Sequence, residues 1–268
     1  MKNSDIKKEV RRFWNSSPCG TYLIKHREGT PEYYREIDLY RYSRYPYAYS
    51  YLPGIAGFSR SRGKSVLEVG CGVGTDLAQF AKHGADVTGI DMSSKEIELA
   101  KKRFKVTGLK GRLVVGDAEN LPFDSECFDL VYSFGALHHT PDTKKAIDEI
   151  HRVLKPNGKT IIMLYHKRSF EYLTQIVRKF IHPSRWKWTL QEAVSYQTEM
   201  NKNPSGPTNP LTKVYTKREA GKLFDLYKEV ETKIYYLRIP ILGRVIPNFF
   251  LYYPSRIIGW HIIIKAKK

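Results

Sequence analysis

Three glycines stand at alternate positions between a short apolar run and a segment of helix-forming residues. They are Gly70, Gly72 and Gly74, and the helix-forming segment begins at Thr75. Glycine adopts positive φ without steric cost and lets a ligand approach the main chain closely. The first turn of a helix presents free backbone N–H groups, which attract a carboxylate or a phosphate. The pattern therefore predicts a ligand site at a turn that joins a strand to a helix.

Acidic residues lie at defined places around these glycines. Glu68 precedes Gly70 by two residues, and Asp91 ends the next apolar run, 21 residues after Gly70. Asp117 follows the third run, in the segment VVGDAENLPF. A carboxylate such as that of Asp91 can accept both hydroxyl protons of a ribose in a charge-assisted contact. The glycines and the acids together indicate a cofactor that contains a nucleoside.

The spacing of the glycines distinguishes between two classes of cofactor. A dinucleotide site uses the pattern GxGxxG. Here the third glycine of that pattern would be replaced by Thr75 or by Leu77, so a nicotinamide oxidoreductase is not expected. The spacing GxGxG after Glu68 instead resembles motif I of the class I methyltransferases that use S-adenosylmethionine (SAM). For a single motif the alternative is purely structural: a tight glycine turn, with Asp91 as a helix cap.

Four motifs in the same order carry this resemblance. The segments SFGALHHTPD (133–142) and IHRVLKPNGKTIIML (150–164) are similar to the ubiquinone/menaquinone-type small-molecule subgroup, the type 11-like methyltransferases. The resemblance covers residues 64–166 strongly and 212–268 weakly. It implies SAM as cofactor, S-adenosylhomocysteine as product, and Asp117 as the acceptor for the adenine amino group. The cofactor-binding residues that it implies are Glu68, Gly70, Cys71, Gly72, Gly74, Thr75, Asp91, Met92, Asp117, Ala118, Ser133, Phe134 and Tyr45.

Methyl transfer from SAM is an in-line displacement, so the protein chiefly has to align and desolvate the acceptor. A general base raises the rate where the acceptor carries a proton. Ligands of open parallel sheets bind beyond the carboxyl ends of the strands, which makes His138, Tyr165 and His166 the candidate catalytic residues. The alternatives are that His138 and His139 hold their loop by packing, and that Tyr165 faces the core. No metal site is expected.

A parallel sheet has to position these residues. Strand-like runs alternate with helical patterns at 75–83, 93–106 and 142–154, and the runs lie at 65–70, 86–91, 112–116, 128–134, 159–166, 230–237 and 259–267. This order predicts an α/β fold, a Rossmann-like, doubly wound, mostly parallel seven-stranded sheet with an antiparallel last strand. We expect a lid at 1–63, a SAM-binding core at 64–166, a helical insert and loop as substrate cap at 167–215, and a C-terminal helix with the last two strands at 216–268.

Helix boundaries follow from capping and stop residues. Ser93 or Ser94 is expected to cap the helix that ends at Val106. The sequence Thr216-Lys-Arg-Glu is a capping box that opens a helix through Leu226. The helix at 142–154 is expected to stop at Pro156-Asn157-Gly158. Residues 168–200 look helical, and 201–210 read as a loop rich in proline, asparagine and glycine.

The segment 13–54 is dense in tyrosine and tryptophan, interleaved with arginine. In the family that the chain resembles, residues before motif I fold over the SAM site. Aromatic faces suit a sulfonium and arginine suits a carboxylate, which makes Tyr22, Arg41, Tyr42 and Tyr45 the lid candidates. An amphipathic helix that packs its aromatic face on the sheet is the alternative. The stretch from Trp14 to Thr21 is expected to be a tight loop.

Composition and charge indicate which stabilising elements, cellular location and partners to expect. The 268 residues include 41% hydrophobic residues, enough for a substantial core, and three cysteines without ligand spacing, so neither a disulfide framework nor a zinc site is expected. The first residues lack a secretory signal pattern, and we expect a cytoplasmic protein. The net charge of +18 is uneven, with +7 on residues 1–64, −1 on 65–166 and +12 on 167–268. The basic flanks fit a phosphate-bearing substrate, a membrane surface, RNA, or simply a well-solvated surface.

The apolar stretch 240–264 has a longest charge-free run of 11 residues, which is too short for a spanning helix of about 18–20 residues. It could lie on a membrane surface, form an acceptor channel or a dimer face, or simply connect packed elements. The leading hypothesis is a SAM-dependent enzyme that methylates a small lipid-like, quinone-like or secondary-metabolite acceptor. An RNA methyltransferase that uses the basic flanks, and a SAM-binding protein without catalysis, are the alternatives. The sequence leaves the acceptor atom and the oligomeric state open.

Overall fold

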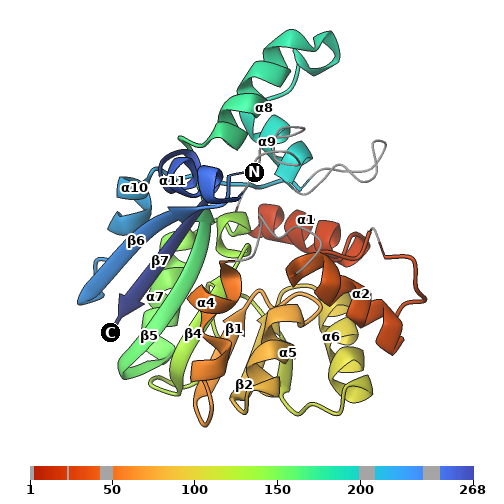
Figure 1. Cartoon of the computed structure of the whole chain (residues 1–268), viewed down its shortest axis with the longest axis vertical. Helices are drawn as coiled ribbons and strands as arrows, with labels where there is room; N and C mark the ends of the chain where they lie inside the picture. The colour runs from red at the N-terminus through yellow and green to blue at the C-terminus, as the bar shows by residue number, and fades with distance from the viewer. Residues whose placement is uncertain (1–2, 23, 43–50, 199–208, 238–247) are drawn as a thin grey trace.

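The computed structural model of the chain describes residues 3–22, 24–42, 51–198, 209–237 and 248–268. A seven-stranded sheet lies at its centre, with helices on both faces (Figure 1). The strand order is β3-β2-β1-β4-β5-β7-β6, and β7 runs antiparallel to both of its neighbours. The strands are β1 (Ser65–Val69), β2 (Asp86–Asp91), β3 (Arg112–Val115), β4 (Phe128–Phe134), β5 (Leu154–Tyr165), β6 (Glu229–Tyr235) and β7 (His261–Lys267). The predicted fold class is confirmed.

Helices precede the sheet, join its strands and extend from it. They are α1 (Asn3–Ser16), α2 (Pro31–Tyr42), α4 (Leu52–Ala56), α5 (Thr75–Lys82), α6 (Ser94–Val106), α7 (Thr143–Val153), α8 (Phe170–Ile181), α9 (Leu190–Thr198), α10 (Lys217–Lys222) and α11 (Asn248–Ile258). Short 3₁₀ turns lie at η1 (Phe58–Arg60), η2 (Leu137–His139) and η3 (Pro183–Arg185).

The sheet separates two apolar cores because successive side chains of a strand point to opposite faces. Along β5, Ile161, Met163 and Tyr165 belong to the core under α4, α5 and α6, whereas Ile162 and Leu164 belong to the core under α7 and α10. Both faces of the central strands are therefore covered, as a parallel sheet requires. This burial holds the carboxyl ends of β1, β2 and β4 rigidly beside one another.

Two predicted helix starts are confirmed by their caps. Ser93 Oγ accepts the N–H of Glu96 at 3.1 Å. Thr216 Oγ1 accepts the N–H of Glu219 at 3.2 Å, and the Glu219 carboxylate accepts the N–H of Thr216 at 2.8 Å. Each cap satisfies backbone donors that have no partner within the helix. These contacts are local in sequence, and that is why the residue pattern alone predicts them.

The expected helix stop at Pro156-Asn157-Gly158 is wrong. Helix α7 ends at Val153, and the fully buried Leu154 already has an extended backbone and pairs with Phe128 of β4. The turn residues instead lie inside β5, where Asn157 has a φ of 62° and the register between β4 and β5 shifts. Burial of Leu154 against the sheet thus ends the helix before the local stop signal is reached.

Two other helix ends differ from the prediction. Helix α10 ends at Lys222 rather than Leu226, because the next two N–H groups bond to carbonyls three residues back and tighten the chain into turns. Helix α1 continues through Ser16, so the first part of the expected loop from Trp14 to Thr21 is helical. The apolar stretch 240–264 contains a further helix, α11, which the sequence did not predict. The loop residues 201–208 and the residues 240–247 lie outside the described residues.

Candidate functional site

The strand–helix turn lies where the glycines predicted it. Gly70, Gly72 and Gly74 have φ values of 72°, 52° and 74°. A Cβ at Gly70 would lie 2.1 Å from Cβ of Ala136, so no larger residue fits there. The N–H groups of Gly70 and Cys71 donate to the carbonyl of Ile90 at the end of β2. These bonds fix the turn against the neighbouring strand and leave its outer side to a ligand.

Asp91 is held against this turn. One carboxylate oxygen accepts the N–H of Gly72 at 3.0 Å, and the other accepts the N–H of Ser93 at 2.9 Å. Burial raises the pKa of Asp91, although the N–H groups of Ser93 and Gly72 act in the opposite direction. The side chain is 8% exposed. A carboxylate fixed in this way presents its remaining lone pairs to whatever lies above the turn.

Glu68 is buried in β1 directly before the glycines, and its Oε2 has no hydrogen-bond partner among the described residues. Burial raises the pKa of Glu68 well above its ordinary value, and the nearby carboxylate of Asp76 adds to the effect. A buried polar atom without a partner costs roughly 1–3 kcal/mol. The lone acceptor beside a turn open to ligands therefore suits a group that donates hydrogen bonds, above all a cationic one.

Asp76, in the first turn of α5, binds two of the predicted lid residues. Arg41 donates from Nε at 3.0 Å and also from Nη2, and the Tyr42 hydroxyl donates at 2.5 Å. Tyr132 of β4 donates a further hydroxyl bond at 2.8 Å. Burial alone would raise the pKa of Asp76, but the Arg41 guanidinium beside it lowers that pKa. Arg41 also lies 4.7 Å above the Phe134 ring, so the network reaches the end of β4.

The N-terminal helix α1 contacts the same edge of the sheet. Lys7 lies 2.6 Å from Asp117 Oδ2 and 2.6 Å from Glu119 Oε2. Burial would lower the pKa of Lys7, but hydrogen bonds to both carboxylates raise it. At the other end of α1, Asn15 Oδ1 accepts from the Ser93 hydroxyl at 2.9 Å. A helix from the expected lid segment thus spans from Asp117 to the start of α6.

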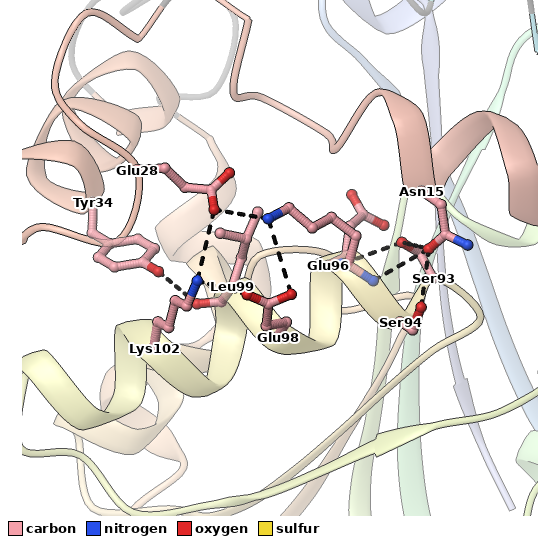
Figure 2. Close-up of polar contacts among 10 residues, drawn as sticks. Asn15, Glu28, Tyr34, Ser93, Ser94, Glu96, Glu98, Leu99 and Lys102 are labelled. Atoms are coloured by element: carbon pink, nitrogen blue, oxygen red, sulfur yellow. Dashed lines mark hydrogen bonds and ion pairs between the residues drawn. The ribbon is translucent and has the colours of Figure 1, made fainter.

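Figure 2 shows the polar contacts between the N-terminal segment and α6. Asn15 Oδ1 also accepts the N–H of Lys95 at 3.2 Å. Further along the helix, Lys95 donates to Glu28 at 2.8 Å, and the Tyr34 hydroxyl donates to the Leu99 carbonyl at 2.7 Å. Helices α1 and α2 therefore cover α6 by polar contacts along its length. Of the other lid candidates, Tyr22 pairs with Tyr40, and Tyr45 lies outside the described residues.

Aromatic and histidine side chains gather at the carboxyl ends of β4 and β5 and the start of β7. We name this group the aromatic cluster, and its members are Phe134, His138, Tyr165, Trp260 and His261. The Tyr165 ring lies 3.8 Å from that of His138 and 4.4 Å from that of Trp260, and the Phe134 and His261 rings are 5.4 Å apart. The described residues include no group of three or more His, Cys, Asp or Glu side chains that could hold a metal ion. The aromatic cluster is thus mainly apolar, and its only polar ring atoms besides the Tyr165 hydroxyl and the Trp260 indole N–H are the imidazole nitrogens of His138 and His261.

Both histidines of the cluster are buried. His138 is fully buried, and neither ring nitrogen has a hydrogen-bond partner among the described residues. Burial lowers the pKa of His138 well below 6.5, and His139 and His261 lower it further. Burial, together with Arg41, does the same to the pKa of His261, whose Nδ1 lies 2.5 Å from the Tyr51 hydroxyl. Neutral imidazoles can accept a hydrogen bond or a proton at neutral pH.

The structure brings two of the three predicted catalytic residues together. His138 and Tyr165 are in contact in the aromatic cluster, and Tyr165 also belongs to the apolar core, as the alternative stated. His166 instead donates from Nδ1 to the Gly259 carbonyl at 2.9 Å, and burial lowers its pKa. Its described contacts hold the connection between β5 and β7.

The remaining predicted cofactor residues occupy the same edge of the sheet. Thr75 starts α5, Met92 follows Asp91, and Ala118 follows Asp117. Ser133 of β4 donates its hydroxyl to the Val69 carbonyl at 2.8 Å, which ties β4 to the start of the glycine turn. Lys7, Tyr51, Asp76, Trp260 and His261 were not predicted.

Comparisons with known proteins match the part of the chain that contains the glycine turn. Residues 67–162 match the family model described as a methyltransferase domain. The phthiotriol/phenolphthiotriol dimycocerosates methyltransferase of Mycobacterium tuberculosis is 45% identical over 98 residues, which cover 36% of each chain. A ubiquinone biosynthesis O-methyltransferase of Coxiella burnetii is 34% identical over 139 residues, covering 46% of this chain and 59% of that protein.

A sterol 4-C-methyltransferase of Caenorhabditis elegans is 36% identical over 98 residues, covering 36% of this chain and 29% of that protein. The match spans about a third of the length of the first of these relatives. By their names, all three of these methyltransferase relatives act on small molecules or in their synthesis.

Solved structures agree on the fold of the methyltransferase domain. A protein of Pyrococcus horikoshii has a TM-score of 0.57 at 21% identity, over 88% of this chain and 98% of that one. A SAM-dependent methyltransferase of Aquifex aeolicus has a TM-score of 0.54 at 16% identity, over 87% and 97% of the two chains. The Rossmann-like fold expected from the family resemblance is confirmed.

Proposed function

We propose that the chain is a SAM-dependent methyltransferase whose acceptor is a small apolar molecule, such as a lipid, a quinone precursor or a secondary metabolite. The observation that carries the proposal is the glycine turn held between two buried carboxylates, Asp91 and Glu68. When bound, SAM supplies an electrophilic methyl group on a sulfonium. The domain match and the methyltransferase relatives support the same function.

The residues present suit this cofactor in charge and in hydrogen bonding. SAM carries an ammonium group, and the unpartnered Oε2 of Glu68 is a buried acceptor that an ammonium would satisfy. Asp91 would accept ribose hydroxyls, and Asp117 the adenine amino group. A Cβ at Gly72 would meet nothing nearer than Glu96 Oε1 at 3.6 Å, whereas at Gly74 it would lie 3.3 Å from Cβ of Ala100, so the free space beside the turn is at Gly72. The other proposed contacts are those of Gly70, Cys71, Thr75, Met92, Ala118, Ser133, Phe134 and Tyr45.

The aromatic cluster is the proposed acceptor side. Its rings would remove water from an apolar acceptor and hold it in line, which is the main contribution of the protein to methyl transfer. His138 is the proposed base or hydrogen-bond acceptor, because both of its buried ring nitrogens lack a described partner. Tyr165 would position His138 by stacking on it. His166 remains a candidate contact at the edge of this region.

A membrane-dissolved acceptor would favour contact with a bilayer. We propose that the described part of 240–264 contributes to peripheral contact, because Phe250, Tyr252, Tyr253 and Ile257 of α11 are exposed. None of the helices in the described part of the chain has the length and apolarity needed to span a bilayer. A cytoplasmic location is part of this proposal.

Calorimetric titration with SAM tests the cofactor site. Asp91→Asn should weaken binding by about tenfold or more, since a charge-assisted contact contributes roughly 1.5–3 kcal/mol. Asp86→Asn is the matched control, because Asp86 is exposed at the opposite end of the same strand, β2. Transfer of a labelled methyl group to a lipid extract would test the acceptor class. Absence of SAM binding by the unaltered chain would refute the proposed function.

A further inference from the structure

Helix α8 carries its apolar side chains on the outside. The exposed set is Leu173, Val177, Phe180 and Ile181, which recur at the spacing of one helical face, together with Trp186 just after the helix. We name these five residues the α8 surface. Their exposed fractions lie between 47% and 64%. Figure 1 shows α8 projecting from the body of the molecule, next to α9.

The inward side of α8 contains the polar Gln175 as well as Tyr172, which packs against the apolar core. Gln175 is 1% exposed, and its side-chain N–H group donates to Glu171 at 3.0 Å. A helix on the surface of a water-soluble domain normally buries its apolar stripe and exposes its polar one. Helix α8 nevertheless leaves four large apolar side chains of one face in solvent, and such faces usually mark an interaction site.

Basic residues surround the α8 surface. Residues 167–190 contain six Lys/Arg and a single acidic residue, Glu171, which gives a net charge of +5. The Lys179 ammonium lies 4.8 Å above the Phe180 ring, and the Trp186 indole donates to the Phe180 carbonyl at 2.8 Å. Exposed apolar residues with tryptophan and flanking basic side chains are the composition of helices that lie in a lipid interface.

The charge decides between two occupants of this face. In a symmetric dimer the same patch meets itself, so a net charge of +5 would face another +5 across an apolar contact. An anionic bilayer instead attracts the basic side chains while it accepts the apolar ones. We propose that the α8 surface docks the chain on a bilayer that contains anionic lipid.

Helix α8 lies close in the chain to the aromatic cluster, which is the proposed acceptor side. Helix α8 begins five residues after Tyr165, the member of the aromatic cluster that ends β5. A docked α8 would hold the carboxyl ends of β4 and β5 near the bilayer, where an apolar acceptor is dissolved. Only this consequence rests on the proposed function, because the docking itself requires neither SAM nor an acceptor.

Flotation with vesicles tests the docking on the full chain without SAM. The probes are vesicles of phosphatidylcholine alone and vesicles that include about a third phosphatidylglycerol. We expect binding to the anionic vesicles that weakens at least tenfold in Phe180→Glu/Ile181→Glu. Leu226→Glu is the matched control, because it replaces an equally exposed apolar residue between α10 and β6. Lys187→Glu should weaken binding several-fold, and added salt should weaken binding of the unaltered chain.

The possible outcomes separate the proposals. Unaltered thermal unfolding of the double variant shows that it folds, as expected for two side chains that are mostly exposed. Vesicle binding that the double variant retains, or no binding by the unaltered chain, would overturn the docking. A dimer in sedimentation equilibrium that the double variant dissociates would assign the face to a second copy instead. A chain that binds SAM but not vesicles refutes the docking, together with the bilayer contact proposed for α11, and leaves the proposed methyl transfer standing. A chain that binds vesicles but not SAM refutes the proposed methyl transfer and leaves the docking standing.

Discussion

Replacing Arg41 with methionine would leave the buried Asp76 without its cation. The guanidinium donates two bonds to Asp76, and the Glu68 carboxylate nearby has no described partner on one oxygen. Methionine keeps much of the length of the arginine stem but carries no charge. The variant thus leaves the Asp76 carboxylate buried near the Glu68 side chain, with the hydroxyls of Tyr42 and Tyr132 as its remaining described side-chain donors.

The expected loss follows from the burial of this pair. Removing one partner of a buried ion pair costs about 3–5 kcal/mol, because the other charge stays buried and unpaired. The two tyrosine hydroxyls still stabilise Asp76, so we expect the lower end, about 3 kcal/mol. For a chain of this size that loss lowers the melting temperature by roughly 6–12 °C. Asp76→Asn in the same background removes the unpaired charge and should recover at least half of the loss.

Urea denaturation at pH 7 of the unaltered chain, both single variants and the double variant measures this coupling. Lys102→Met is the control, since Lys102 pairs with Glu98 at 2.6 Å on the exposed face of α6, and its removal should leave the urea midpoint nearly unchanged. A loss below about 1 kcal/mol in Arg41→Met, or additive losses in the double variant, would refute the reasoning. Either result would mean that Asp76 is not a buried anion that depends on Arg41.

Three further predictions follow from other contacts. The lowered pKa values of His138 and His261 mean that the unfolded chain takes up protons below pH 6.5 before the folded chain does. Stability should therefore be complete above pH 6.5 and fall by about 1.4 kcal/mol per histidine at pH 5.5, and a flat urea midpoint over this range would contradict it. Gly70→Ala should destabilise the fold by more than about 2 kcal/mol in urea and abolish SAM binding, because the new Cβ meets Ala136; unchanged urea stability would show that the turn can shift. Lys7→Met should tighten SAM binding several-fold in calorimetry, since the ammonium occupies the carboxylate of Asp117 that adenine would use, and weaker binding would instead make Lys7 a support.

The sequence predicts the elements of this fold well where the signals are local. The caps of α6 and α10 and the glycine turn at 70–74 depend on residues a few positions apart, and the structure has them as expected. The start of β5 was missed because it depends on a contact between Leu154 and Phe128, which are distant in the chain. Tertiary packing overrides a local stop signal in such a case.

The residues of the candidate site also differ in whether a local sequence pattern predicts them. Glu68, Asp91 and Asp117 could be proposed as a set, because each lies at or just beyond the carboxyl end of a predicted parallel strand, and these ends meet at one edge of the sheet. His261 could not be proposed from a motif, since it begins an antiparallel strand far from the glycines. Its place beside Phe134 depends on β7 pairing with β5, a topological fact that the residue types around His261 do not state.

Strand β7 lies between β5 and β6 in the sheet, although it follows both of them in the chain. During synthesis, β5 is therefore complete long before its partner on that side exists. Until then it presents an unpaired edge whose alternate residues, from Ile161 to Leu164, are destined for two apolar cores. The nascent chain thus has a stage in which this edge can pair with another molecule, and we expect the yield of folded protein to depend on how soon β7 follows, separately from the stability of the completed sheet.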